Sequence, residues 1–427
     1  MNNIITKISV AAVLIIVSVS LSAQTYDVRE RVAADYGKIA GCEGAYRYDA
    51  SPLTTAPKGY TPFYISHYGR HGSRYAWNDD TYIVIARVLE AARQTGSLTG
   101  MGETFYRRFM DFYKIPLINY GNLVPLGFEQ HRRIAETMFE EFPEVFSNGG
   151  KVAVRSSVSQ RAIASMSAFC SSLVKCSPKL EMDISVLNAD MCVANPAEAP
   201  DELFRNISGE LKRPSDDGTV TNIQKKHYDD VLNRLFTDRG FLEDAGGRQK
   251  FIFELFMLWS GYHNYCDEDI FEFLFTKEEL VDFWEGENYR LYLSHTEERY
   301  LTIPLLEDII DRADEALKEG GCVAHLRFGH DRALNAFTTL INIDGSGFEP
   351  DCASDVKYWF QNYNCPMACN LQFVFYRSKK NPEILFKLLR NNSEVSLPQL
   401  DPVSGPYYRW SDFVSWAHVL MAEHPQK

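Results

Sequence analysis

The segment Arg70-His71-Gly72-Ser73-Arg74 has the composition of a site that handles phosphate. Two guanidinium groups flank an imidazole, and a guanidinium keeps its charge and matches phosphate oxygens with a planar fork of N–H groups. An imidazole held among such groups can attack phosphorus as a nucleophile, which replaces one difficult hydrolytic step with two easier ones. The segment therefore predicts covalent phosphoryl chemistry at His71.

The elements that must position these residues alternate between strands and helices. The apolar segments 62–66, 151–155 and 322–328 are typical of buried strands, and each leads to a polar group: Arg70-His71, Arg155 and His330-Asp331. Apolar residues at helical spacing follow these three strands at 81–95, 160–174 and 332–341, and another such segment, 305–318, precedes the third strand. The segments 371–376 and 384–389 are typical of a closing pair of strands. This order predicts an α/β fold with a mostly parallel sheet flanked by helices, whose ligands gather beyond the carboxyl ends of the strands.

Residues 181–304 differ from the rest of the chain in both pattern and charge. Helical spacing dominates there, as in 250–259 and 278–284, and we count 12 Lys or Arg against 26 Asp or Glu. We expect a helical cap at 181–304, inserted into a catalytic core formed by 24–180 and 305–427. The acidic surface disfavours nucleic acid as a partner, because binding it depends on clustered cations.

The first 23 residues are typical of a secretory signal peptide. Lys7 precedes an apolar stretch from Ile8 to Leu21, and Ser22-Ala23 supplies the small residues of a cleavage site. The stretch is shorter than the roughly 20 apolar residues that cross a bilayer. We expect cleavage near Ala23, export to the periplasm or the extracellular space, and no stable membrane anchor.

Several segments together resemble the histidine acid phosphatases, the large branch of the histidine phosphatase superfamily, whose signature is Arg-His-Gly-x-Arg. The late strand is similar to that of the multiple inositol polyphosphate phosphatase and phytase group. The matching segments are 70–74, 123–131, 155–157 with Arg161 and Ser165 following, 329–331 and 370–376. One departure is the distal His330-Asp331-Arg332, because animal-type polyphosphatases have His-Ala-Glu there.

The resemblance implies a phosphoglycerate-mutase-like core and a role for each matched residue. His71 is the expected nucleophile, Arg70, Arg74, Arg155 and His330 are the expected phosphate ligands, and Asp331 is the expected proton donor. It implies neither a metal nor an organic cofactor. The expected substrate is a small phosphomonoester: an inositol polyphosphate such as phytate first, with sugar phosphates or bisphosphoglycerate as further candidates. Arg161 lies inside a predicted helix, and we expect it to form a structural salt bridge.

Two other functions fit parts of the sequence. A zinc hydrolase would use His67, His71, His325 and His330 with Asp331, but the interleaved arginines would repel a dication. A catalytically inactive protein that binds a phosphate ligand would most simply lack the nucleophile or the donor, and both are present.

Overall fold

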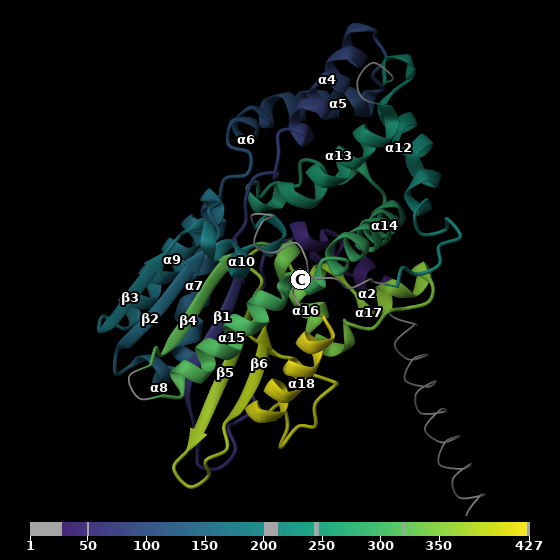
Figure 1. The fold of residues 1–427 in the computed structure, drawn as a ribbon. Coiled ribbons are helices and arrows are strands. Elements are labelled where there is room, and N and C mark those ends of the chain that lie inside the picture. The colour runs from purple at the N-terminus through teal and green to yellow at the C-terminus, as the bar shows by residue number, and fades with distance from the viewer. Residues whose placement is uncertain (1–27, 49–50, 200–211, 243–246, 319–320, 425–427) are drawn as a thin grey trace, which may run out of the picture.

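The computed structural model describes residues 28–48, 51–199, 212–242, 247–318 and 321–424. One mixed sheet forms the centre, with helices on both of its faces and a helical cap beyond one end (Figure 1). The predicted signal peptide lies outside the described residues. In the described part of the chain, no helix is long and apolar enough to cross a membrane.

The sheet has the order β3-β2-β4-β1-β5-β6-β7, and β8 pairs with β6. The strands are β1 (Tyr60–Arg70), β2 (Gly150–Ser156), β3 (Leu180–Ser185), β4 (Ala324–Gly329), β5 (Asn370–Ser378), β6 (Leu385–Arg390), β7 (Ser393–Glu394) and β8 (Tyr408–Arg409). The first four in this order are parallel, and β5 and those beyond it pair antiparallel. The predicted α/β class and the closing pair of strands are confirmed.

Alternating side chains divide the core between the two faces of the sheet. On one face, Val152 and Val154 of β2 and Phe328 of β4 pack against α7 (Pro125–Glu141) and α9 (Gln160–Cys176). On the other face, Tyr64 and Tyr68 of β1 pack against further helices. These are α15 (Ile303–Ala316), α16 (Asp331–Leu340) and α18 (Trp410–Glu423).

The strand that carries the motif is longer than the sequence predicts. We expected a strand over 62–66, but β1 begins at Tyr60 and continues to Arg70. It lies between β4 and β5, and backbone hydrogen bonds pair it on both sides up to Gly69. Neighbours on both sides keep the backbone extended despite the polar residues His67 and Arg70, and the turn begins only at His71.

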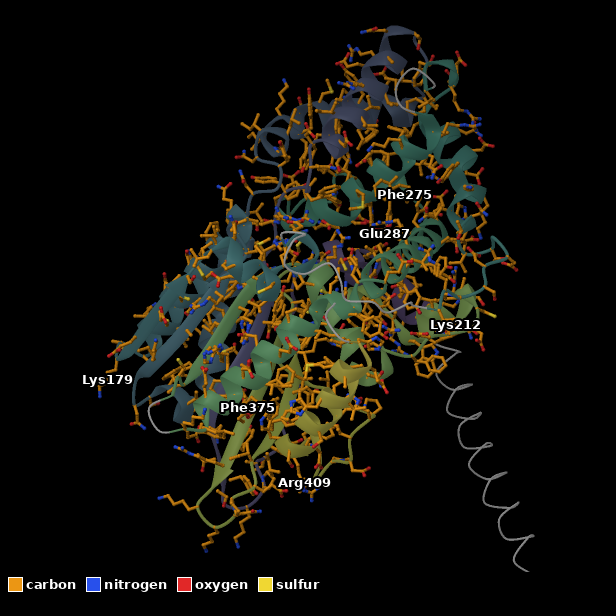
Figure 2. The ribbon with its side chains drawn as sticks, viewed as in Figure 1. Lys179, Lys212, Phe275, Glu287, Phe375 and Arg409 are labelled. Atoms are coloured by element: carbon orange, nitrogen blue, oxygen red, sulfur yellow. The ribbon has the colours of Figure 1, made fainter. Side chains whose placement is uncertain are left out.

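The cap has its own apolar core, which contains Phe275 and is separate from the sheet core around Phe375 (Figure 2). Its helices are α4 (Asp80–Gln94), α5 (Gly100–Phe112), α12 (Tyr228–Leu235), α13 (Gly247–Gly261) and the first half of α14 (Lys277–Thr296). The helices α4 and α5 therefore pack with the predicted insertion, although they precede it in sequence.

The structure also places residues 181–185 in the sheet and not in the cap. They form most of β3, which pairs with β2 from Gly150↔Leu180 to Arg155↔Ser185. The strand lies at the edge of the sheet, where charged residues such as Glu181 and Asp183 discourage pairing with another molecule. Because of those acidic residues, the segment lacks the run of apolar residues by which the other strands were predicted.

Candidate active site

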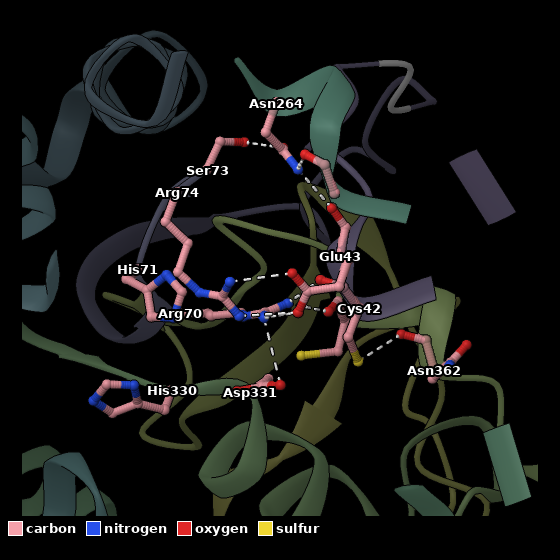
Figure 3. A network of polar contacts seen from close by, with 12 residues as sticks. Cys42, Glu43, Arg70, His71, Ser73, Arg74, Asn264, His330, Asp331 and Asn362 are labelled. Carbon is pink, nitrogen blue, oxygen red and sulfur yellow. Dashed lines mark hydrogen bonds and ion pairs between the residues drawn. The ribbon is translucent and has the colours of Figure 1, made fainter. Parts of the chain in front are cut away.

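Parallel pairing of β1 with β4 brings the two histidine motifs together. Arg70 is in register with Gly329, so that His71 and His330 follow at the same edge of the sheet. The centroids of their rings are 5.4 Å apart. Figure 3 shows both rings beside Asp331, the first residue of α16.

The imidazole of His71 is oriented for nucleophilic attack. Its Nδ1 lies 2.9 Å from the backbone oxygen of Gly72, and because a carbonyl only accepts, Nδ1 carries the proton. The lone pair is then on Nε2. Burial lowers the pKa of His71 well below its usual value, and the charges of Arg70, Arg161 and Arg74 lower it further. A neutral ring with a free Nε2 is the form that attacks phosphorus.

Backbone oxygens and one carboxylate hold the two motif arginines. Arg70 Nη1 donates to the carbonyl oxygens of Cys42 and of Cys365, the latter at 2.9 Å. Arg74 donates through Nη2 and Nη1 to the two carboxylate oxygens of Glu43, at 2.9 and 3.1 Å. These contacts fix both guanidinium groups before any ligand arrives.

Several buried nitrogens of the arginines remain without a hydrogen-bond partner in the described part of the chain. They are Nε and Nη2 of Arg70, Nε of Arg74 and Nε of Arg161. A buried donor without a partner costs about 1–3 kcal/mol, so such groups normally have a ligand. Four of them close to His71 indicate a site for an anion with several oxygens.

The third arginine of the site is Arg161, and the prediction of Arg155 is wrong on geometry. Arg161 lines the cleft with His71, whereas Arg155 lines a separate hollow with Arg327. Because Val154 faces the α7–α9 side, its neighbour Arg155 points to the opposite face. There its Nη1 donates to the backbone oxygens of Val154 and Asp183. Arg161, in the first turn of α9, lies just beyond the end of the strand, and the salt bridge expected of it is not found among the described residues.

The expected distal pair, His330 and Asp331, contacts a serine hydroxyl and two of the arginines. His330 Nε2 lies 2.9 Å from Ser157 Oγ, and its Nδ1 lies 3.4 Å from Arg161 Nη2. Burial and the charge of Arg161 lower the pKa of His330 to about 3. Asp331 Oδ2 lies 3.4 Å from Arg70 Nη2. Burial acts to raise the pKa of Asp331, but Arg70 and other neighbouring cations outweigh it and hold the pKa below its usual value.

These residues lie at the base of a cleft of about 420 Å³ between the sheet and the cap. Helix α13 of the cap supplies an apolar wall that includes Phe253 and Met257, and the second half of α14 supplies Glu287 and Arg290, which pair with each other. The charged residues that line the cleft are balanced. They are Arg74, Arg161, Arg290 and Arg332 against Glu43, Glu198, Glu287 and Asp331.

Sequence reasoning missed residues that lie outside the matched segments. Glu43 lines the cleft and Asn264 contacts its backbone, but both are single polar residues in short 3-10 helices, and no motif or periodicity marks them. His295 on α14 also lines the cleft. Two basic pairs of the insertion, Lys212-Arg213 and Lys225-Lys226, do not line the cleft; Lys212 pairs with Asp351, and Lys226 pairs with Asp282.

The imidazoles of the zinc alternative do not converge. His67 packs between Phe169 and Phe328 beneath the site, and His325 contacts the hydroxyl of Tyr64 in the separate hollow. Among the described residues, one group of His, Cys, Asp or Glu side chains is close enough to share a metal ion. It consists of His263, Asp269 and Glu272, none of which lines the cleft. The geometry therefore excludes the zinc centre considered from the sequence.

The profile of the histidine phosphatase superfamily, branch 2, matches residues 69–391. The chain belongs to this superfamily, and it is accordingly a phosphomonoesterase. No curated protein matches the sequence.

Solved structures share the fold over most of its length. The multiple inositol polyphosphate phosphatase of Bifidobacterium longum, in complex with inositol hexasulfate, aligns with a TM-score of 0.72 and 20% identity over 91% of this chain and 98% of its own. The phytase from D. castellii aligns with a TM-score of 0.68 and 16% identity, over 92% of this chain and 86% of its own. The phytase from Citrobacter braakii aligns with a TM-score of 0.54 and 14% identity, over 84% of this chain and 98% of its own.

Proposed function

We propose that the protein hydrolyses phosphomonoesters through a phosphohistidine on Nε2 of His71, with Asp331 as the proton donor. The observation that carries the proposal is the group of buried nitrogens without a hydrogen-bond partner on Arg70, Arg74 and Arg161, beside the free Nε2. A phosphoryl group in transfer spreads charge over its equatorial oxygens, and preorganised cations directed there supply most of the stabilisation.

In the first step, Nε2 of His71 attacks phosphorus, and the bond from phosphorus to the ester oxygen breaks. The leaving oxygen takes a proton from the carboxyl of Asp331. In the second step, that carboxylate accepts a proton from water, which attacks the phosphohistidine and releases inorganic phosphate. Each atom and proton is accounted for without a cofactor.

The charge of the substrate prepares Asp331 for its role. In the free site, neighbouring cations keep the carboxyl ionised, which is the wrong state for a donor. A bound phosphate dianion offsets the charge of Arg70 and its neighbours, so the pKa of Asp331 rises and the group takes up a proton. Asp331 therefore becomes an acid only when there is a leaving group to protonate.

Inositol polyphosphates are the first candidate substrates, with sugar phosphates and bisphosphoglycerate as further candidates. The phosphatase of known structure with the same fold was solved with inositol hexasulfate, in which sulfates replace the phosphates of inositol hexakisphosphate. The cleft of about 420 Å³ is within the range of small-molecule sites, roughly 300–1,000 Å³.

The deciding experiment combines a substrate panel with a trap for the intermediate. Purified protein should release phosphate from inositol hexakisphosphate, and acid-labile, base-stable phosphate should remain on the chain after rapid quenching during turnover. His71→Ala should abolish both signals, whereas His263→Ala, which changes an exposed histidine outside the cleft, should retain both. Turnover without trapped phosphate, or trapped phosphate in His71→Ala, would refute the mechanism.

We also propose that the protein is exported after cleavage near Ala23, as residues 1–23 predict. N-terminal sequencing of the mature protein tests this, and a chain that still begins at residue 1 in the cytoplasm contradicts it.

A further inference from the structure

Glu43 lies beside the phosphate-binding arginines although it belongs to no catalytic motif. It ends the short helix η1 (Gly41–Glu43), far upstream of the motif, and lines the cleft. Its carboxylate accepts two hydrogen bonds from Arg74, and its Oε1 lies 4.0 Å from Arg70 Nη2. The side chain is 14% exposed, so water screens this charge only weakly.

The cap and the motif together fix the position of Glu43 (Figure 3). Asn264 of the cap donates through Nδ2 to the backbone oxygen of Glu43 at 2.8 Å. The other end of the same amide accepts a hydrogen bond of 2.6 Å from Ser73 Oγ. Asn264 thereby connects η1 to the residue that precedes Arg74, and the Glu43 carboxylate is held in one place.

This arrangement determines what Arg74 can offer a ligand. Both of its terminal nitrogens are engaged by Glu43, and Nε alone is buried without a partner. Glu43 also places a negative charge near the position where a phosphate dianion must bind. Two like charges in a weakly screened site repel each other by an amount that changes affinity appreciably.

We propose that Glu43 is a positioning residue that orients Arg74 and, through its charge, limits how tightly the site holds phosphate. This inference rests on the proposed phosphatase function. Without this charge the three arginines would be offset less, by Asp331 and not by Glu43, and the site would hold inorganic phosphate, the product, more firmly. Glu43 sets the affinity low enough for the product to leave.

The sign of one binding measurement separates this role from a merely structural one. In Glu43→Gln the oxygen that remains can still accept a hydrogen bond from Arg74, but the charge is gone. We expect calorimetry to show that inorganic phosphate binds about tenfold more tightly than to the wild type, as Coulomb repulsion is removed. A residue that only held Arg74 in place would give weaker binding, and weaker or unchanged binding would overturn the proposal.

A matched control removes the charge of another carboxylate that pairs with an arginine. Asp35 binds Arg47 through both oxygens in the same N-terminal region, but neither residue lines the cleft. Asp35→Asn should bind phosphate within about twofold of the wild type, because the half-buried Asp35 carboxylate lies outside the cleft and does not face the bound anion. A similar tightening in both variants would mean that net charge alone acts, which contradicts a specific role for Glu43.

Steady-state kinetics give an independent readout. Glu43→Gln should lower KM and the inhibition constant of phosphate together, and should lower kcat as well, because product release slows. The binding test needs no turnover, so it remains informative if the wild type proves inactive. Inactivity would refute the proposed function, whereas the wrong sign of the binding change would refute the role of Glu43.

Discussion

Exchanging Arg161 and Arg155 in turn for methionine distinguishes the site found in the structure from the one expected from the sequence. Methionine keeps a long unbranched side chain and removes the charge. Arg161 lines the cleft with His71, whereas Arg155 donates to backbone oxygens in a separate hollow. Arg161→Met should therefore cripple catalysis, and Arg155→Met should leave it nearly unchanged.

The pKa of Arg161 gives the size of the effect. Burial lowers it from 12.5 to about 10, and the nearby charge of Arg74 contributes. That difference corresponds to about 3 kcal/mol of unfavourable free energy for the charged guanidinium in the empty site. A bound phosphate dianion relieves this strain, so the interaction of Arg161 with phosphate is of the same order. A loss of about 3 kcal/mol lowers kcat/KM by roughly 100-fold.

The assay is release of nitrophenol from nitrophenyl phosphate, with thermal unfolding to verify that both variants fold. We expect kcat/KM to fall about 100-fold in Arg161→Met and to stay within roughly threefold in Arg155→Met. Loss of activity in Arg155→Met with full activity in Arg161→Met would show that the third phosphate ligand lies on β2 after all, and would refute the assignment made from the cleft.

Asp331→Asn should slow the phosphorylation step for inositol phosphates by about 10²–10⁴-fold in single-turnover experiments and affect nitrophenyl phosphate far less, because only the poor leaving group needs a proton; an equal loss for both contradicts its role as donor. Burial lowers the pKa of both His67 and His131 to about 3, so the unfolded chain takes up protons below pH 6.5 that the folded chain rejects. The free energy of unfolding should therefore fall by about 2 kcal/mol for each histidine between pH 7 and pH 5. Urea unfolding measures this, and equal midpoints at the two pH values would contradict it. Because 181–304 is strongly acidic, kcat/KM for inositol hexakisphosphate should rise with salt near neutral pH, and a steep fall would indicate that cations dominate the cleft.

The sequence predicted most of the strands and helices that carry the site, because their apolar patterns reflect burial on one or two faces. The helix expected at 160–174 is α9 (Gln160–Cys176), and the strand expected at 151–155 is β2. It did not predict β3, since an edge strand with acidic residues has too little apolar pattern. It also predicted too short a strand at 62–66, because the pairing that extends β1 to Arg70 depends on strands far away in sequence.

The candidate site was predicted where residues follow directly from the end of a strand and missed where tertiary contacts decide. His71, His330 and Asp331 come together because β1 and β4 are parallel and in register. Whether Arg155 faces the cleft depends on which face of the sheet its neighbours fill, and the motif does not contain that information. Glu43 contacts Arg74 only because of how the N-terminal segment packs, and no pattern in the residues around Glu43 predicts that packing.

The position of β1 has a consequence for how the protein is made. The side chain of Arg70 donates to the backbone oxygen of Cys365, which lies 295 residues further along the chain, and its backbone N–H donates to the backbone oxygen of Cys369. Contacts between residues so distant in sequence form slowly, because a long loop must close before they contribute any stability. The motif is therefore synthesised early but assembled late, and a nascent chain that has passed His71 has no ordered phosphate site until β5 is complete. The onset of phosphatase activity during refolding then reports completion of the sheet.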